Sequence, residues 1–351
     1  MTPSNDTSQA LAQQVTGAFR AKRALHIIAG GSKAFFGNPV EAEPLDVNAH
    51  CGIIEYEPSE LVLTARGGTP LHEIEAALGA SRQMLAFEPP MHSRQTTFGG
   101  AIATGLSGPR RACAGAVRDF VLGTTIINGK GDILKFGGQV MKNVAGYDAS
   151  RLMAGAQGTL GVLLDISVKV LPLAESEITL AFAMDEREAH QRLRQWVLQG
   201  HAISASCYTD GTLYIRLSST ASSVVHSARQ LGGETGTGEL WAQLRNQTHP
   251  FFEHNTPLWR LSLPPATPPV LAGYRQLIEW GGALRWVSCE TPLYEQAAAL
   301  GGHATRYALH GKGGTNLFQP LNTALLNLHQ RLKQAFDPVS ILNPGRLYTD
   351  L

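Results

Sequence analysis

The stretch that decides the fold reads QTTFGGAIATGLSG and covers residues 95–108. It carries no charge and consists almost entirely of small or hydroxyl-bearing side chains, so as a structural element alone it would bury little apolar surface. Glycine has no Cβ and lets the backbone approach a ligand closely, and glycine-rich turns can aim successive N–H groups into one concavity. The stretch therefore suits a wall against a flat aromatic ring and a pyrophosphate.

Two further segments offer bare backbone of the same kind. The sequence GGSK at residues 30–33 follows a strand expected at 25–29 and adds a hydroxyl group and one cation to two glycines. The sequence GAQGTLG at residues 155–161 precedes another expected strand. An ordinary tight turn explains the first segment equally well when it stands alone, but three such segments favour one shared ligand. They account for part of the glycine excess in residues 30–161, which hold 21 of the 37 glycines, and hairpin turns account for another part.

The composition limits the class of protein. The 351 residues suggest about two domains. The net charge of +1 argues against nucleic acid or an anionic membrane surface as a main partner. The four cysteines lie far apart, which disfavours a zinc or iron–sulfur site within the chain. No apolar run approaches the roughly 18 residues of a membrane span, and the polar start lacks the features of a signal peptide. We expect a cytoplasmic protein that reaches a membrane, if at all, through a complex.

The pattern of expected elements changes after Pro172. Before it, β-rich runs separated by turn residues predict hairpins at 52–65 and 120–136, the second around Asn128-Gly129. Thr69-Pro70 is typical of a helix start, with threonine as the N-cap. After it, short antiparallel strands alternate with a few helices, which is typical of an α+β domain.

Two other nucleotide-binding motifs fail on spacing. A G-x-G-x-x-G turn followed by a helix and an acidic residue is absent, which disfavours a dinucleotide-binding Rossmann domain. The run from Gly123 to Gly129-Lys130 has five intervening residues, lacks a serine or threonine after the lysine, and lies in an expected hairpin. A P-loop is therefore disfavoured as well.

The segments together resemble the FAD-binding fold shared by vanillyl-alcohol oxidase and p-cresol methylhydroxylase (PCMH-type). The motifs that carry the resemblance are GGS at 30–32, EPP at 88–90, TFGG at 97–100, VMKNVAGYD at 140–148, GTLGV at 158–162 and ILNPGR at 341–346. The segments MKNVAGYD and SGPRR narrow it to the family of FAD-binding second subunits of bacterial glycolate oxidase. In that family two flavin-binding subunits and one iron–sulfur subunit oxidise glycolate to glyoxylate and pass electrons toward the respiratory chain.

This resemblance implies a fold, a set of boundaries and a binding site. The implied fold is α+β, with a two-subdomain PCMH-type FAD-binding domain, a small α+β (ferredoxin-like) cap domain, and a C-terminal tail that returns to the FAD domain. The implied boundaries are 1–172, 173–320 and 321–351. The implied FAD contacts are Gly30, Gly31, Ser32 and Lys33 on the pyrophosphate; Pro90, Thr97, Gly99, Gly100, Ala103, Thr104 and Gly108 along the pyrophosphate and isoalloxazine; Gly158, Thr159, Gly161 and Val162 on the adenosine side; and Asn343 and Arg346 from the C-terminal segment.

Two departures from the family pattern change the expected chemistry. Members that attach flavin covalently carry histidine after the paired glycines, where this chain has Ser32-Lys33, so FAD should be non-covalent. Catalytic 2-hydroxy-acid members carry H-G-D-G-N-x-H, which supplies metal ligands. The nearest stretch here, HGKGGTN at 310–316, has one of the two histidines and places Lys312 where the acid would stand. A cation there opposes metal binding, so we expect no metal site.

Oxidation of a 2-hydroxy acid also needs a base for the hydroxyl proton and a cation for the carboxylate. Arg111 and Arg346 are candidate cations, because each belongs to a segment expected near the cofactor. Three histidines are candidate bases, but none has a recognisable partner pattern, and we interpret each as structural or surface: His92, His303 and His310. The catalytic residues stay open at this point.

Three functions remain in competition. The first is an FAD-dependent oxidoreductase subunit of a glycolate oxidase complex, partnered by a catalytic flavoprotein subunit and an iron–sulfur subunit, in which this chain relays electrons or supports the catalytic subunit. The second is an autonomous FAD-dependent dehydrogenase of a small 2-hydroxy acid such as D-lactate. The third is a scaffold subunit that has lost its flavin.

Overall fold

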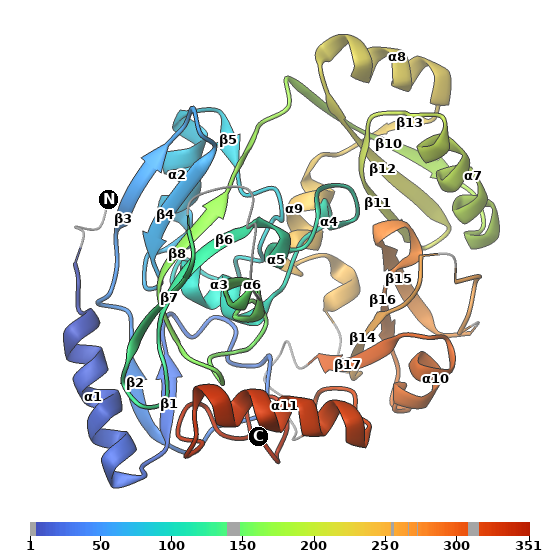
Figure 1. Cartoon of the computed structure of the whole chain (residues 1–351). Coiled ribbons are helices and arrows are strands. Elements are labelled where there is room, and N and C mark those ends of the chain that lie inside the picture. Colours follow the sequence, from blue (N-terminus) through green and yellow to red (C-terminus); the bar gives the residue numbers. More distant parts are fainter. Residues whose placement is uncertain (1–4, 139–147, 254–255, 266, 272, 308–315) are drawn as a thin grey trace.

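The computed structural model describes residues 5–138, 148–253, 256–265, 267–271, 273–307 and 316–351. Figure 1 shows two halves, a first domain drawn in blue and green and a second domain drawn in yellow-green to orange. The final helix α11 (Thr323–Phe336) lies along the bottom of the molecule in this view.

The described part of the first domain is built mainly on two sheets, with β5 (Gln83–Met84) and β9 (Leu171–Pro172) forming a further short antiparallel pair. A short parallel pair at the N-terminal end consists of β1 (Leu25–Ile28) and β2 (Glu43–Asp46). A five-stranded antiparallel sheet has the order β3-β4-β8-β6-β7. Its strands are β3 (Ile53–Glu57), β4 (Val62–Arg66), β6 (Val121–Ile127), β7 (Ile133–Gly137) and β8 (Val162–Lys169).

Helices cover these sheets with their apolar faces. In α2 (Leu71–Ala80), Leu71, Ile74 and Leu78 recur at helical spacing and are fully buried in the core that also contains residues of β4 and β8. The remaining elements of this domain are α1 (Ser8–Ala21), α3 (Phe98–Thr104), α4 (Arg111–Ala114), α5 (Val117–Phe120) and α6 (Ala149–Leu152).

Local sequence signals explain most of these elements. The Asn128 side chain accepts hydrogen bonds from the N–H groups of Lys130 and Asp132, which closes the predicted turn between β6 and β7. Two expectations were wrong. Residues 98–104 lie in a stretch whose glycines and small residues favour a loop, but they form a short helix, which Thr97 caps by accepting the N–H of Gly100. Thr69 does not cap α2, since its hydroxyl donates to the Arg66 carbonyl instead.

The second domain contains one eight-stranded sheet in the order β13-β10-β12-β11-β15-β16-β14-β17. Its strands are β10 (Ser176–Ala183), β11 (Ile203–Thr209), β12 (Thr212–Ser219), β13 (Glu234–Gly236), β14 (Leu258–Ser262), β15 (Arg275–Glu279), β16 (Leu284–Ser288) and β17 (His303–Tyr307). Its helices are α7 (Glu186–Leu198), α8 (Ala221–Leu231), α9 (Glu239–Asn246), α10 (Tyr294–Ala299) and two 3₁₀ turns at Pro250–Phe252 and Trp280–Gly282.

The two faces of this sheet have different partners. Helices α7, α8 and α10 cover one face. The other face packs against the first domain, where Trp286 and Tyr307 of the sheet share a core with Phe36 and Leu106. Opposed residues of antiparallel strands project to the same side, so the register also puts Arg260 on this inner face, since it pairs with Trp286 and Thr305.

The C-terminal segment returns to the first domain, as the resemblance implied. Leu25 in β1 donates its N–H to the Ile341 carbonyl and accepts from the N–H of Asn343. The ammonium group of Lys333 is buried and bonds to Asp337 Oδ2 and to the carbonyls of Thr159 and Leu342. This buried pair ties α11, the tail and the first domain together.

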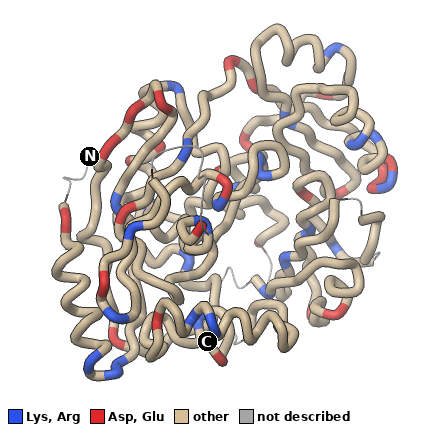
Figure 2. Tube along the Cα trace, viewed as in Figure 1, with Lys and Arg blue, Asp and Glu red and all other residues tan. Residues whose placement is uncertain are grey.

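Charged side chains of both signs are interspersed along the chain (Figure 2). This distribution agrees with the net charge of +1. No described helix is long and apolar enough to cross a membrane.

Candidate functional site

A cavity of about 180 Å³ opens in the first domain where the three predicted segments meet the C-terminal tail. We call it the first-domain cavity. An adjoining hollow of about 620 Å³ shares Gly30, Gly31 and Thr97 with it and extends it outward. The predicted residues that line the cavity are Gly30, Gly31, Ser32, Lys33, Thr97, Gly99, Gly100, Ala103, Thr104, Gly158, Gly161, Val162, Asn343 and Arg346.

The glycine positions have specific steric causes. A Cβ on Gly30 would overlap the carbonyl group of Gln95, and a Cβ on Gly99 would lie 2.9 Å from the Gly67 carbonyl oxygen. Gly31 has φ +66°, a conformation that L side chains rarely adopt. The loop after β1 can therefore approach Gln95, and the start of α3 can approach the turn after β4, only because no side chain separates them.

The tail closes one end of the cavity through Asn343. Its Oδ1 accepts the N–H of Ile27 at 2.7 Å, and its Nδ2 donates to the Gln157 carbonyl at 2.7 Å. One side chain thus joins β1, the third glycine segment and the C-terminal motif.

Arg346 lines the cavity, and its guanidinium group is held by hydrogen bonds to the protein. Its guanidinium donates to Gln157 Oε1 and to the carbonyls of Ala34, Phe36 and Asn38, at 2.8 to 3.1 Å. Burial lowers its pKa to about 10. These bonds fix the loop that follows Lys33, so the guanidinium is engaged by protein and is not free to hold a substrate carboxylate.

Lys33 is the unusual polar residue of the cavity. Its side chain is only 7% exposed, and its Nζ makes no hydrogen bond with any described residue. Burial, together with the positive charge of Arg245, lowers the pKa of Lys33 to about 7. The ring of His92 lies nearby, with its Nε2 also without a partner among described residues, and burial together with Lys33 lowers the pKa of His92 to about 4.

Three predicted contacts do not line the cavity. Gly108 instead packs against Glu88 and accepts a hydrogen bond from Trp280 Nε1 in the second domain. Thr159 is buried and donates its hydroxyl to the Ala156 carbonyl. Pro90 is absent from the lining.

The sequence reasoning also missed several lining residues: His26, Ile27, Ile28, Ala29, Ala34, Val47, Gly67, Gln157 and Leu163. Gln157 lies inside a segment that was singled out, and the pair Gly67-Gly68 after β4 was a usable signal. The others carry no local signal, because their position depends on β1 packing against residues far along the chain.

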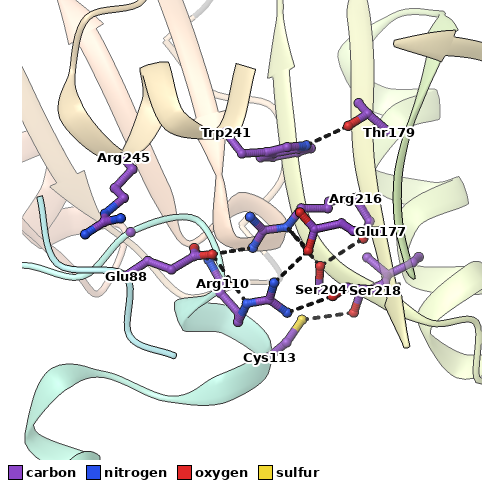
Figure 3. Close-up of polar contacts among 12 residues, drawn as sticks. Glu88, Arg110, Cys113, Glu177, Thr179, Ser204, Arg216, Ser218, Trp241 and Arg245 are labelled. Carbon is purple, nitrogen blue, oxygen red and sulfur yellow. Dashed lines mark hydrogen bonds and ion pairs between the residues drawn. The ribbon is translucent and has the colours of Figure 1, made fainter. Parts of the chain in front are cut away.

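A second polar feature holds the two domains together (Figure 3). We call Glu88, Arg110, Glu177 and Arg216 the interdomain network. Glu88 accepts from the N–H of Arg110 at 2.7 Å and forms an ion pair with Arg216 at 2.8 Å, while Arg110 also pairs with Glu177 at 2.8 Å. Arg216 is 4% exposed, so these charges are largely removed from water.

In the part of the chain that the structure describes, no three His, Cys, Asp or Glu side chains form a group that could hold a metal ion. The HGKGGTN stretch falls largely outside the described residues, as does most of VMKNVAGYD.

Comparisons with known proteins first define the class. The model of the FAD-binding domain family matches residues 6–137, which contain most of the first-domain cavity. The solved structure of an alkyldihydroxyacetonephosphate synthase is similar in fold, with a TM-score of 0.66 at 14% identity over 98% of this chain and 76% of that one. The chain is thus built as a two-domain flavoprotein.

Relatives then define the family. Glycolate oxidase subunit GlcE of Escherichia coli is 50% identical over 349 residues, which is 99% of both chains. A D-lactate dehydrogenase of Anaerostipes hadrus is 32% identical over 39% of this chain and 28% of its own length. Glycolate oxidase subunit GlcD of Bacillus subtilis is 34% identical over 36% of this chain and 27% of its own. The chain belongs to the family of glycolate oxidase subunit GlcE.

Proposed function

We propose that this chain is the FAD-binding subunit of a glycolate oxidase complex, which oxidises glycolate to glyoxylate and passes electrons through flavin to an iron–sulfur subunit. The observation that carries the proposal is the end-to-end relationship to subunit GlcE, because it spans both domains and not only the shared FAD-binding domain. Within the complex, the chain relays electrons or supports a catalytic flavoprotein subunit.

The residues of the first-domain cavity fit a dinucleotide that carries negative charge. Burying the Lys33 ammonium group without a hydrogen-bond partner is unfavourable in free energy, and its neighbours Arg245 and His92 supply no negative charge. A pyrophosphate would provide the missing acceptor. Bare backbone at Gly30, Gly31 and Gly99 leaves room for close approach. When bound, FAD supplies the acceptor for the two electrons of the substrate.

Non-covalent binding follows from the loop after β1. The position next to the paired glycines is Ser32, whose hydroxyl oxygen accepts a hydrogen bond from Thr96 Oγ1 at 2.9 Å. This bond joins the first glycine segment to the second. The side chain at this position thus shapes the loop and carries no group that links flavins.

Two observations favour the relay role over autonomous oxidation. Lys312 replaces the acid of the metal-binding motif found in catalytic relatives. The guanidinium of Arg346, considered for the substrate carboxylate, is taken up by the loop at 34–38. An autonomous dehydrogenase and a flavin-less scaffold are the alternatives that the experiment must separate from it.

An anaerobic titration of the purified chain with glycolate separates these roles. We expect a yellow protein whose flavin absorbance does not bleach with glycolate or D-lactate, but does bleach when the partner subunits are added. Bleaching of the isolated chain would contradict the relay role, and a colourless chain purified with excess FAD would leave only the scaffold.

A further inference from the structure

A second cleft, of about 860 Å³, lies between α4 of the first domain and α7 of the second domain. None of its described wall residues lines the first-domain cavity. The wall includes the largely buried side chains of Trp280 and Leu193, so its deeper part is apolar. A cleft of this size can enclose a ligand much larger than a single ion. We call it the α4–α7 cleft.

Three arginines in the wall of this cleft have no ion-pair partner among the described residues. Arg111 comes from α4, and Arg187 and Arg194 lie about two turns apart on α7. None of the three side chains forms a hydrogen bond with a described residue either. Arg192 belongs to the same helix but not to the wall, and it pairs with Glu188 at 2.8 Å. The unpaired arginines of α7 are therefore those that line the cleft.

The net charge of this wall is positive. Its one described acid is Asp119, which lies near Arg111 and whose carboxylate accepts the N–H of Ala116. Burial lowers the pKa of His190, so that its ring adds no charge near neutral pH. Three arginines against one carboxylate leave a formal charge of +2. A partner of complementary charge would therefore present carboxylates to the cleft.

Two contacts hold the cleft in shape before anything binds. The guanidinium carbon of Arg111 lies 4.4 Å from the centre of the Trp280 ring, which attracts the cation but does not neutralise it. Arg285 is fully buried, donates to the Thr267 carbonyl of the wall at 3.3 Å and pairs with Glu186 at 2.7 Å. Glu186 is thereby engaged and does not neutralise the wall. A preformed cleft loses less conformational entropy when a ligand binds.

Exposed apolar side chains line the same cleft at the end of α7. Val197 is 56% exposed and Leu198 is 78% exposed. They are the two most exposed large apolar side chains of the described residues, and both belong to the wall. Covering them with a partner would remove apolar surface from water. Exposed apolar residues next to a charged rim are typical of protein–protein interaction surfaces.

We propose that the α4–α7 cleft docks an acidic polypeptide segment of a partner subunit. Carboxylates of the segment pair with Arg111, Arg187 and Arg194, and its apolar side chains cover Val197 and Leu198. A free anion would use the arginines alone, so the exposed apolar pair favours a polypeptide. The choice of partner rests on the proposed function, in which this chain works beside a catalytic flavoprotein subunit and an iron–sulfur subunit.

The test measures binding of the full chain to the two purified partner subunits of the same organism by calorimetry. We expect the double variant Arg187→Glu/Arg194→Glu to bind about tenfold more weakly or worse, because both charges are reversed. Leu198→Ser should bind about tenfold more weakly, because less apolar surface is covered. Arg192→Glu is the matched control, since it makes the same change on the same helix outside the cleft, and it should bind like the wild type.

Three further measurements complete the design. Thermal unfolding and FAD content check that each variant is folded, and all four positions are exposed. Added salt should weaken binding of the wild type more than that of the double variant. An array of overlapping peptides from both partner subunits then identifies the docked segment, and we expect the bound peptides to combine several acidic residues with a large apolar one.

The outcomes separate this proposal from the proposed function. Equal affinity in the wild type, the double variant and Leu198→Ser would overturn the docking site and leave the proposed function standing, because the complex still forms. An equal loss in Arg192→Glu would overturn it as well, since only overall charge would then be sensed. A wild type that binds neither subunit would contradict the proposed function together with the docking site. Self-association of the wild type that the double variant abolishes would assign the cleft to a second copy of this chain and overturn the choice of partner.

Discussion

The first-domain cavity and the interdomain network are two polar regions of opposite construction. In the cavity, backbone and tail residues are fixed by internal hydrogen bonds, and the ammonium group of Lys33 has no hydrogen-bond partner among the described residues. In the interdomain network, side chains from different domains meet as ion pairs, Glu88 with Arg216 and Arg110 with Glu177. The cavity teaches how a chain builds a pocket from local segments, and the network how it joins two domains through charged side chains.

The sequence indicated the residues of the first-domain cavity much better than those of the interdomain network. Gly30, Thr97 and Asn343 sit in segments whose residue types alone demand close backbone contact or capping. Arg216 lies in an ordinary strand, and its ion pair with Glu88 depends on β12 facing a residue far back along the chain. Gly108 and Arg346 also make contacts distant in sequence that no local signal predicts: Gly108 accepts a hydrogen bond from Trp280, and Arg346, which lines the cavity, donates to Gln157.

The largest expected effect comes from a substitution that disrupts the closure of the cavity by the C-terminal tail. Asp337→Ala leaves the Lys333 ammonium buried without its partner, which should lower the free energy of unfolding by about 3–5 kcal/mol. Urea denaturation measures it. The control is Glu188→Ala, which breaks an exposed pair with Arg192 and should change the free energy by about 1 kcal/mol or less. Equal effects would show that the tail does not stabilise the cavity.

The second effect comes from a substitution that weakens the interface between the two domains. Glu88→Ala removes the carboxylate shared by Arg110 and Arg216, and should lower the free energy of unfolding by about 2–4 kcal/mol because both cations stay largely buried. Limited proteolysis should then cut more readily between the domains. Glu43→Ala, which breaks an exposed pair with Arg23, is the control and should stay near the wild type. Unchanged proteolysis in Glu88→Ala would contradict the role of the interdomain network.

A smaller effect is expected from a substitution that tests the close approach of backbone segments in the cavity. Gly99→Ala places a Cβ against the Gly67 carbonyl, and should weaken FAD binding or the first domain by about 1–3 kcal/mol. Gly17→Ala in α1 is the control, because its Cβ meets nothing within 4 Å. It should stabilise the chain by about 0.5–1 kcal/mol through helix propensity. The opposite signs of the two changes can be read from thermal unfolding with and without FAD.

The smallest effect per step is a pH dependence, at most about 1.4 kcal/mol for each pH unit. Without FAD, the pKa of Lys33 is held near 7, below its unfolded value of 10.5, so the unfolded chain binds more protons between these pH values and stability should rise with pH there. An anion beside Lys33 restores the charged form, so FAD affinity should fall by up to about tenfold per pH unit across the same window. Lys33→Met should flatten the pH dependence of both stability and FAD affinity. Unchanged curves in that variant would show that Lys33 is not the group responsible.

The most direct test of the central claim is the amount of FAD carried by the purified full-length chain before and after denaturation. The account predicts one FAD per chain, released completely when the protein unfolds, and a marked loss in Lys33→Met with the fold intact. A chain that binds no FAD when flavin is in excess, or one that keeps flavin attached after unfolding, would contradict it.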